Sequence, residues 1–323
     1  MKGHCQNIRD PSKIGVMPFS LLQPLRDIPI AVVDVETSGA SADWGDRVIE
    51  MGIVRVENGA ESARYERLID PKRRISAGVT ALTGISQAMC EGQPTFDQAL
   101  PEFLPLLQGA IILGHNVRFD LSFLDREFRR CGKDLCQELS SPQVMDTVRI
   151  ARRRFGRGGN GLQNLSRRLG YEPPVAHRAL ADVITTFRVF ESLLEPVGGW
   201  QMSLCDALVL QGGPMGVAPM NSRQSILPLE LEEALEQRCP VMMEYLDARQ
   251  QRTERIIQPI ELRRFKGEIV LIAHCQLRND RRNFKLERIV RLTRMADIQD
   301  RASGPRLTTE GTESTEEIQL RLL

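Results

Sequence analysis

The sequence lacks several features that would place it in a specialised class of protein. No apolar run approaches the ~20 residues that a membrane span needs, and the first residues, MKGHCQNIRDPSKIG, lack the apolar core of a signal peptide. The seven cysteines are an odd number and include no Cys-x-x-Cys pair, so no zinc site is indicated. We therefore expect reduced thiols and a cytoplasmic protein.

A strong net charge is also missing. The 323 residues carry a formal net charge of +1, which excludes a chain that is basic throughout. Two segments are nevertheless rich in arginine: residues 146–168 carry seven arginines against one acid, and residues 276–294 carry six against two acids. Such patches are typical of phosphate-binding surfaces, but a solvated helix face or strand edge is an equally good explanation of either one.

The spacing of apolar residues predicts an α/β first domain. Continuous apolar runs indicate buried strands, and apolar residues three and four apart indicate helices that cover a sheet. Strands that precede strand–helix units describe a mixed sheet flanked by helices. The predicted strands are 28–36, 47–57, 64–70 and 109–116, and the predicted helices are 94–107, 119–131 and 178–194.

The remaining segments predict a second, smaller domain that is rich in β-strands. A stretch of Gly, Pro, Met and Ser separates the two domains and is typical of a linker, and the polar C-terminal stretch is typical of disorder. A helix at 228–238 and strands at 240–246, 253–261, 268–275 and 283–286 are expected in the second domain. The predicted boundaries are an extension at 1–27, the first domain at 28–197, the linker at 198–224, the second domain at 225–298 and a disordered tail at 299–323.

Four acids stand where charged side chains are costly. Asp34 and Glu36 alternate on an apolar strand, so both carboxylates point to one face. Asp120 begins one predicted helix, and Asp182 lies one turn into another. Carboxylates that converge from three elements form the hard oxygen site that Mg²⁺ or Mn²⁺ prefers. Taken singly, each acid is better explained as part of an exposed strand edge or as a helix cap than as a metal ligand.

His177 stands five residues before Asp182, and there are only four histidines in the chain. One interpretation is a histidine packed at a helix start. The other is a proton acceptor beside a metal-binding carboxylate, because a neutral imidazole can accept a proton near neutral pH. The combination of His177 with the four acids, in this order, favours the second interpretation.

Three short segments carry a family resemblance: VVDVETSG at 32–39, HNVRFD at 115–120 and HRALAD at 177–182. They resemble the three motifs of the DEDDh 3′–5′ exonucleases, in particular the proofreading (epsilon) branch of bacterial DNA polymerase III. The resemblance implies a ribonuclease H-like fold and two Mg²⁺ or Mn²⁺ ions. It implies that Asp34, Glu36, Asp120 and Asp182 are the metal ligands. It further implies that His177 is the general base and that Thr37 lies near the substrate 3′ end.

The arginines that follow the second of these motifs form a candidate substrate surface. Arg152, Arg153 and Arg154 lie together in the first basic segment. Side chains of this kind bind the phosphates of a single strand without reading its sequence.

The second half resembles a WYL domain through VMMEYLDARQQRTERIIQPIEL, EIVLIAHC and RRNFKLERI, although Ile269-Val270-Leu271 replaces the Trp-Tyr-Leu that names the family. This resemblance implies a small Sm-like barrel that binds nucleic acid or a regulatory ligand, with Arg255, Arg282 and Arg288 as candidate contacts. A purely structural or dimerisation module is the alternative.

A shorter segment, QMSLC at 201–205, is similar to the Gln-x-x-Leu-Phe type of sliding-clamp motif, with Cys205 in place of the aromatic anchor. It would imply a contact with a sliding clamp or polymerase; a plain linker is the alternative.

The function predicted from these residues is a metal-dependent 3′–5′ exonuclease that releases 5′-mononucleotides, with DNA preferred and single strands or 3′ ends as partners. An RNA-trimming 3′–5′ exoribonuclease and a non-enzymatic regulator that binds nucleic acid or nucleotides remain as alternatives, because metal ions act on the phosphate and not on the sugar.

Overall fold

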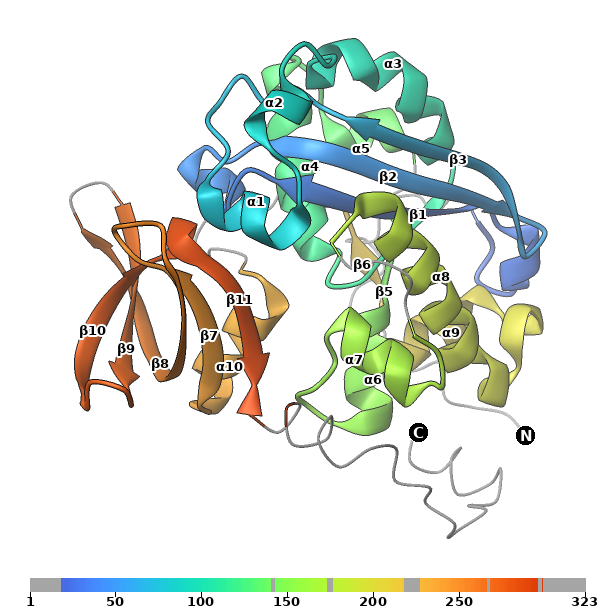
Figure 1. Ribbon diagram of the computed structural model, residues 1–323. Helices are drawn as coiled ribbons and strands as arrows, with labels where there is room; N and C mark the ends of the chain where they lie inside the picture. Colours follow the sequence, from blue (N-terminus) through green and yellow to red (C-terminus); the bar gives the residue numbers. More distant parts are fainter. Residues whose placement is uncertain are drawn as a thin grey trace, which may run out of the picture.

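The computed structural model describes residues 19–140, 143–172, 177–217, 227–265, 268–295 and 298, and Figure 1 shows that they form two sheet-based domains side by side. The predicted tail at 299–323 lies outside the described residues. No helix in the described part of the chain is both long and apolar enough to cross a membrane.

The first domain is built on a mixed sheet, as the sequence predicts, and this sheet has six strands. Its strand order is β3-β2-β1-β4-β5-β6, with β1, β4 and β5 parallel and β2, β3 and β6 antiparallel to their neighbours. The strands are β1 (Ile30–Thr37), β2 (Val48–Glu57), β3 (Ala60–Leu68), β4 (Ile111–Gly114), β5 (Gln143–Asp146) and β6 (Met215–Gly216).

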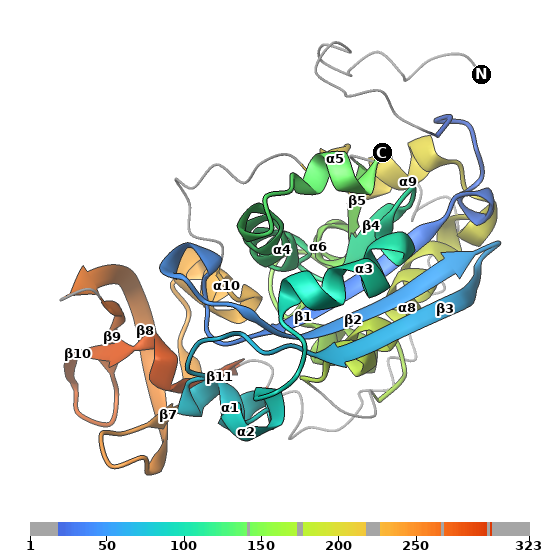
Figure 2. The ribbon, with the colours of Figure 1, turned by 90° about the horizontal axis from the view of Figure 1, so that it is seen from above.

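Helices cover both faces of this sheet, which explains why β1 is apolar on both faces. Val33 and Val35 pack in a core with α3 and α4, whereas Ile30 and Val32 pack with α8. Figure 2 shows the sheet between these two layers. The helices are α1 (Ala77–Thr83), α2 (Gln87–Cys90), α3 (Phe96–Leu107), α4 (Arg118–Arg130), α5 (Leu135–Leu139), α6 (Thr147–Phe155), α7 (Leu162–Arg168), α8 (Ala179–Leu194) and α9 (Leu204–Leu210). Short 3-10 turns are η2 (Leu25–Asp27), η3 (Ala42–Trp44), η4 (Glu195–Val197) and η5 (Gly199–Gln201).

The predicted linker is folded over much of its length. Residues 199–216 include η5, α9 and β6, and β6 pairs with β5 at the edge of the sheet. The last of the described extension, residues 19–27, packs against this segment: the Leu25 amide donates to the carbonyl of Met202 at 2.9 Å. Leu25 is fully buried in the same core as α9, so the packing of apolar side chains determines the structure of this segment. Residues 1–18 and 218–226 lie outside the described part.

The second domain is a five-stranded antiparallel sheet with one helix, α10 (Leu229–Gln237). Its strand order is β10-β9-β8-β7-β11, and the last strand was not expected from the sequence. The described strands end in two edges, β10 and β11, and the predicted Sm-like barrel stays a prediction. The strands are β7 (Val241–Leu246), β8 (Arg252–Phe265), β9 (Glu268–Cys275), β10 (Asp280–Lys285) and β11 (Ile289–Arg294), with the turn η6 (Leu286–Arg288) before β11.

Candidate active site

Strand β1 carries the first two acids of the site. Asp34 and Glu36 continue the row of Ile30 and Val32, whose side chains pack with α8, so both carboxylates face the α8 side of the sheet. The pairing of β1 with β2 shifts register between Glu36 and Thr37. The strand therefore ends directly after the two acids.

Asp120 reaches the same strand from the start of α4. Only 3% of its surface is exposed, and its Oδ1 accepts a hydrogen bond of 3.0 Å from the Val35 amide. Val35 lies between Asp34 and Glu36, so this bond places the Asp120 carboxylate at the acid-bearing end of β1.

Asp182 comes from the third element of the site, α8. It lies in the first turn of α8 with 6% of its surface exposed. Its Oδ2 accepts from the His177 amide at 2.9 Å, and its Oδ1 accepts from Gln163 Nε2 at 3.1 Å. The donor atoms of Glu36, His177 and Asp182 all lie within 4.8 Å of one another. Residues from β1, from α8 and from the loop before α8 thus meet, as the sequence predicts.

A buried ion pair positions the start of α8, and sequence reasoning missed it. Glu50 of β2 is fully buried and pairs with Arg178 Nη2 at 2.6 Å, while its Oε2 accepts from the Ala179 amide at 2.9 Å. Gly52 permits this approach, because a Cβ there would lie 2.5 Å from the Ala179 carbonyl carbon. An acid inside the apolar run of β2 was the available signal, because a buried charge requires a partner.

The electrostatics of the site favour a bound cation. Burial, followed by the neighbouring carboxylates, raises the pKa values of Asp34 and Glu36 well above their ordinary values. Burial raises the pKa of Asp120 to about 8 and that of Asp182 to about 7. Four crowded carboxylates resist ionisation together unless a positive charge is near, and hard oxygen donors suit Mg²⁺ or Mn²⁺. The residues present therefore fit divalent metal ions.

The metal-free protein should lose stability as the pH rises. Asp120 and Asp182 have pKa values of about 8 and about 7 in the folded state, above the ordinary 3.8, so folding favours their protonated forms. Their stabilisation is complete below about pH 4 and is lost through about pH 7–8. A divalent ion binds the ionised forms, so Mg²⁺ or Mn²⁺ should raise the melting temperature little at about pH 5.5 and by on the order of 5 °C at about pH 8. Thermal unfolding with and without EDTA measures this difference; an equal rise at both pH values would contradict the metal assignment.

His177 is available as a proton acceptor. Burial, and secondly the charge of Arg291, lowers its pKa to about 4, so the ring is neutral at physiological pH. Its backbone has a φ of +61°, the left-handed region that Asn, Asp and Gly adopt more readily than other residues. This conformation and the amide bond to Asp182 hold the residue beside the acids.

A cavity with a volume of about 410 Å³ opens onto these residues. Asp34, Glu36, Asp120, His177 and Asp182 all line it, and so does Thr37, whose Oγ1 donates to the Gly39 carbonyl at 2.7 Å. Part of its wall comes from the second domain, which sequence reasoning did not foresee.

The three arginines predicted to bind substrate do not line this cavity in the described residues. Arg152 Nη2 pairs with Glu233 of α10 at 3.3 Å, and the Arg154 guanidinium lies over the Phe155 ring, 5.1 Å from its centre. Arg153 lies beside Gly212, where an added Cβ would be 3.4 Å from its Cδ. Their role in substrate binding stays a prediction.

The predicted ligand contacts of the second domain are spread over three elements. Arg255 of β8 donates through Nε to Thr253 Oγ1 at 3.3 Å, Arg282 is exposed on β10, and Arg288 is half-buried in η6. In the 201–205 segment, Leu204 is fully buried and Ser203 caps α9. That segment therefore does not present its leucine to a partner.

A mixed sheet whose central strand, with two flanking helices, gathers four carboxylates and a histidine at one cavity has an arrangement that could hold a divalent metal ion. The family comparisons specify it further: residues 31–190 match the family model described as Exonuclease, and residues 228–294 match the WYL domain model. The chain thus carries an exonuclease domain of the DEDDh type followed by a WYL domain, as both resemblances imply.

Individual relatives are similar in sequence to this chain over about half of its length. The chain is 37% identical over 165 residues to the 3′-5′ exonuclease DinG of Bacillus subtilis, covering 51% of this chain and 17% of that protein. It is 35% identical over 176 residues to a DNA polymerase III subunit epsilon-like protein of Rhodobacter capsulatus, covering 53% and 24%. The chain thus spans less than a third of the length of either relative. Among solved structures, a full-length 3′-exonuclease is similar with a TM-score of 0.49 and 16% identity, covering 65% of this chain and 73% of that chain.

Proposed function

We propose that the chain is a metal-dependent 3′–5′ exonuclease that acts preferentially on DNA and releases 5′-mononucleotides. The observation that carries this proposal is the meeting of four carboxylates and a neutral histidine at one cavity. Relatives named DNA polymerase III PolC-type and DNA polymerase III subunit epsilon-like protein support DNA as the substrate.

Each residue has a role in this reaction. Asp34, Glu36, Asp120 and Asp182 would hold two divalent ions, which supply positive charge to the scissile phosphate and acidify water when bound. His177 accepts the proton of the attacking water on its imidazole. The water oxygen forms a new bond to phosphorus, and the bond from phosphorus to the 3′ oxygen of the preceding nucleotide breaks. That 3′ oxygen takes up a proton from solvent to become a hydroxyl, and the terminal nucleotide leaves as a 5′-mononucleotide. Thr37 contacts the terminal nucleotide.

The WYL domain, in this proposal, binds nucleic acid or a regulatory ligand. Arg282 is exposed on β10 and Arg255 is only half-buried on β8, so both guanidinium groups are accessible to an anion. Arg288, in η6, is the third contact of the set.

The experiment uses 5′-end-labelled single-stranded DNA and RNA of one sequence, with Mg²⁺, Mn²⁺ or EDTA. We expect a ladder that shortens from the 3′ end on DNA, slower cleavage of RNA, and no cleavage in EDTA. A 3′-blocked oligonucleotide is the control for direction. Faster cleavage of RNA would identify an exoribonuclease, and binding of both strands without cleavage in any metal would identify a regulator.

A further inference from the structure

The second domain forms one wall of the active-site cavity. The second-domain residues that line the cavity come from the start of α10 and from the segment that runs through η6 into β11. A cavity of about 410 Å³ has the size of a small-ligand site, large enough for the end of a single strand. The charged and polar side chains of this wall therefore contact any ligand that enters the cavity.

Arg291 of β11 is the charged residue of this wall that best suits a polyanion. It lines the cavity and is exposed, and no hydrogen bond or ion pair engages its guanidinium among the residues that the structure describes. Its charge acts on His177, where it is the second cause of the lowered pKa. A guanidinium without a partner among the described residues thus acts electrostatically on His177 from the other domain.

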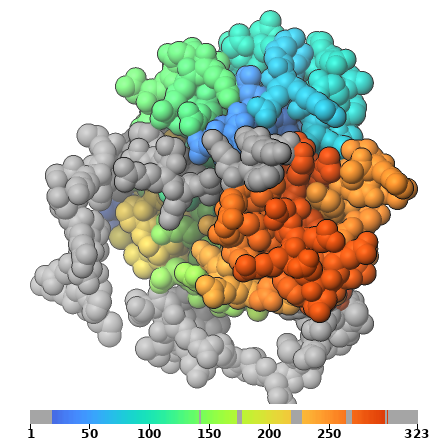
Figure 3. All heavy atoms as spheres, turned by 90° about the vertical axis from the view of Figure 1, so that its left-hand side faces the viewer, coloured from blue at the N-terminus to red at the C-terminus, as the bar shows by residue number. Residues whose placement is uncertain are grey.

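The second domain contacts the first domain at two places beside this wall. On one side, α1 packs tightly on η6: a Cβ at Gly78 would lie 2.6 Å from the Glu287 carbonyl oxygen. On the other side, Arg152 of α6 pairs with Glu233 of α10 at 3.3 Å. Figure 3 shows the second domain in close contact with the first domain on this face.

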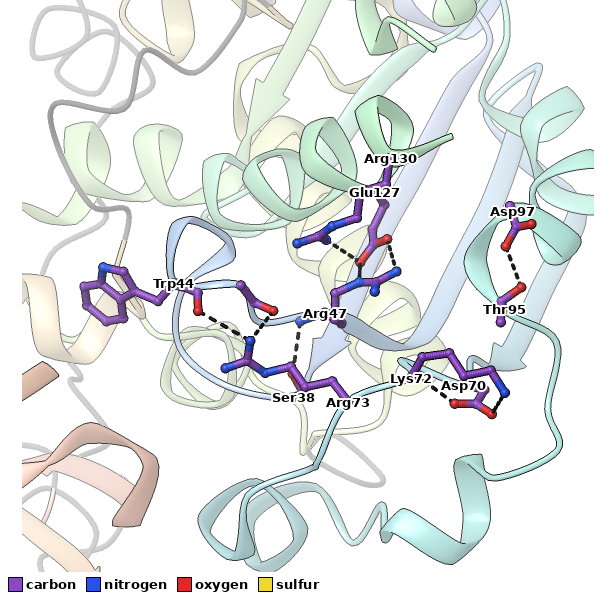
Figure 4. A network of polar contacts seen from close by, with 11 residues as sticks. Ser38, Trp44, Arg47, Asp70, Lys72, Arg73, Thr95, Asp97, Glu127 and Arg130 are labelled. Carbon is purple, nitrogen blue, oxygen red and sulfur yellow. Dashed lines mark hydrogen bonds and ion pairs between the residues drawn. The ribbon is translucent and has the colours of Figure 1, made fainter. Parts of the chain in front are cut away.

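A third contact comes from the loop after β1. Trp44 packs against the core of the second domain, and Arg73 Nη1 donates to the carbonyl of Gly45 beside it at 2.7 Å. Figure 4 shows the Trp44 side chain directed away from the first sheet, while the base of the loop is held by Arg73 and by the ion pair of Arg47 with Glu127. The same loop connects β1, which carries Asp34 and Glu36, to β2, so the domain contact lies in the segment that directly follows the acid-bearing strand.

We propose that Arg291 is a substrate-binding residue of the exonuclease site, supplied by the WYL domain, whose guanidinium contacts a phosphate of the bound strand. The inference rests on the proposed function. A site with four carboxylates repels a polyanion wherever metal ions do not neutralise them, and a guanidinium on the facing wall offsets this repulsion with paired N–H donors. The two domains then form one composite substrate site.

The test compares Arg291→Ala and Arg291→Lys with the control Arg278→Ala, which removes an exposed arginine of the same domain that does not line the cavity. Steady-state cleavage of single-stranded DNA and equilibrium binding of the same strand in EDTA, by fluorescence anisotropy, are measured over a range of salt concentrations. We expect Arg291→Ala to raise KM and the dissociation constant about tenfold. Its salt slope should fall by about 0.7, the loss of one phosphate contact to a single strand. Arg291→Lys should retain the slope, and Arg278→Ala should match the wild type.

Two results would overturn the inference while leaving the proposed function intact. One is wild-type cleavage with KM, binding and salt slope unchanged in Arg291→Ala. The other is faster cleavage by Arg291→Ala, which would make the second domain a shield over the site. A wild-type chain that neither cleaves nor binds either strand would overturn both proposals. Circular dichroism of each variant checks that the fold is retained.

Discussion

Asp34→Ala should reduce nucleotide release by ~10³-fold or more, because in the proposed mechanism the positive charge at the scissile phosphate depends on this carboxylate as a metal ligand. Asp34 lies at the centre of the cluster: Asp120, Asp182 and Glu36 all act on its pKa. Rates are measured from the appearance of 5′-mononucleotides with labelled single-stranded DNA and saturating Mg²⁺.

Loss of activity by unfolding is distinguishable from loss of the metal site. Removal of one of several crowded carboxylates relieves repulsion, so the melting temperature of Asp34→Ala in EDTA should equal or exceed that of the wild type. Asp34→Asn keeps the side-chain volume and should be equally inactive. Asp125→Asn, which removes a carboxylate of α4 paired with Arg129, is the matched control and should stay active. Unchanged nucleotide release by Asp34→Ala would refute the assignment.

His177→Ala should lower the rate ~10²–10⁴-fold, because the attacking water loses its proton acceptor. The substitution keeps the backbone N–H that donates to Asp182, so it removes the imidazole without releasing the loop from α8. The rate is measured under single-turnover conditions, in which product release does not contribute.

The positive φ of His177 makes a second variant necessary as a control for backbone strain. Alanine at a φ of +61° is strained, whereas asparagine adopts this region readily, so His177→Asn tests the proton acceptor without the backbone cost. Both variants should be impaired alike, and His274→Ala, on β9 and outside the cavity, should match the wild type. A loss smaller than about threefold would identify His177 as a packing residue and not as the general base.

Local pattern was sufficient to predict the strand and helix that carry Asp34, Glu36 and Asp182. The alternation of Asp34 and Glu36 predicts two carboxylates on one face, and the structure places both on the α8 side of β1. The amphipathic pattern of 178–194 predicts α8 to within one residue. The approach of Asp120 to Val35 was beyond such reasoning, because it depends on how α4 docks against the sheet and not on residue spacing.

Segments whose structure depends on distant partners were predicted poorly. Residues 199–216 have the composition of a linker, but α9 is buried against Leu25 and β6 adds to the sheet edge. Glu50 was overlooked because its partner, Arg178, is remote in the chain. Strand β11 was overlooked for the same reason, since it is stabilised by pairing with β7.

The sequence by itself determined which acids and which histidine stand on strand and helix ends, and which two family models the halves match. Side-chain alternation and motif order are properties of the chain, and they need no knowledge of the folded neighbours. Only the tertiary structure decided that the second domain lines the cavity and that Arg291 stands on the same cavity wall as part of this lining. That contact depends on the docking of two surfaces, whose complementarity arises only after each domain has folded.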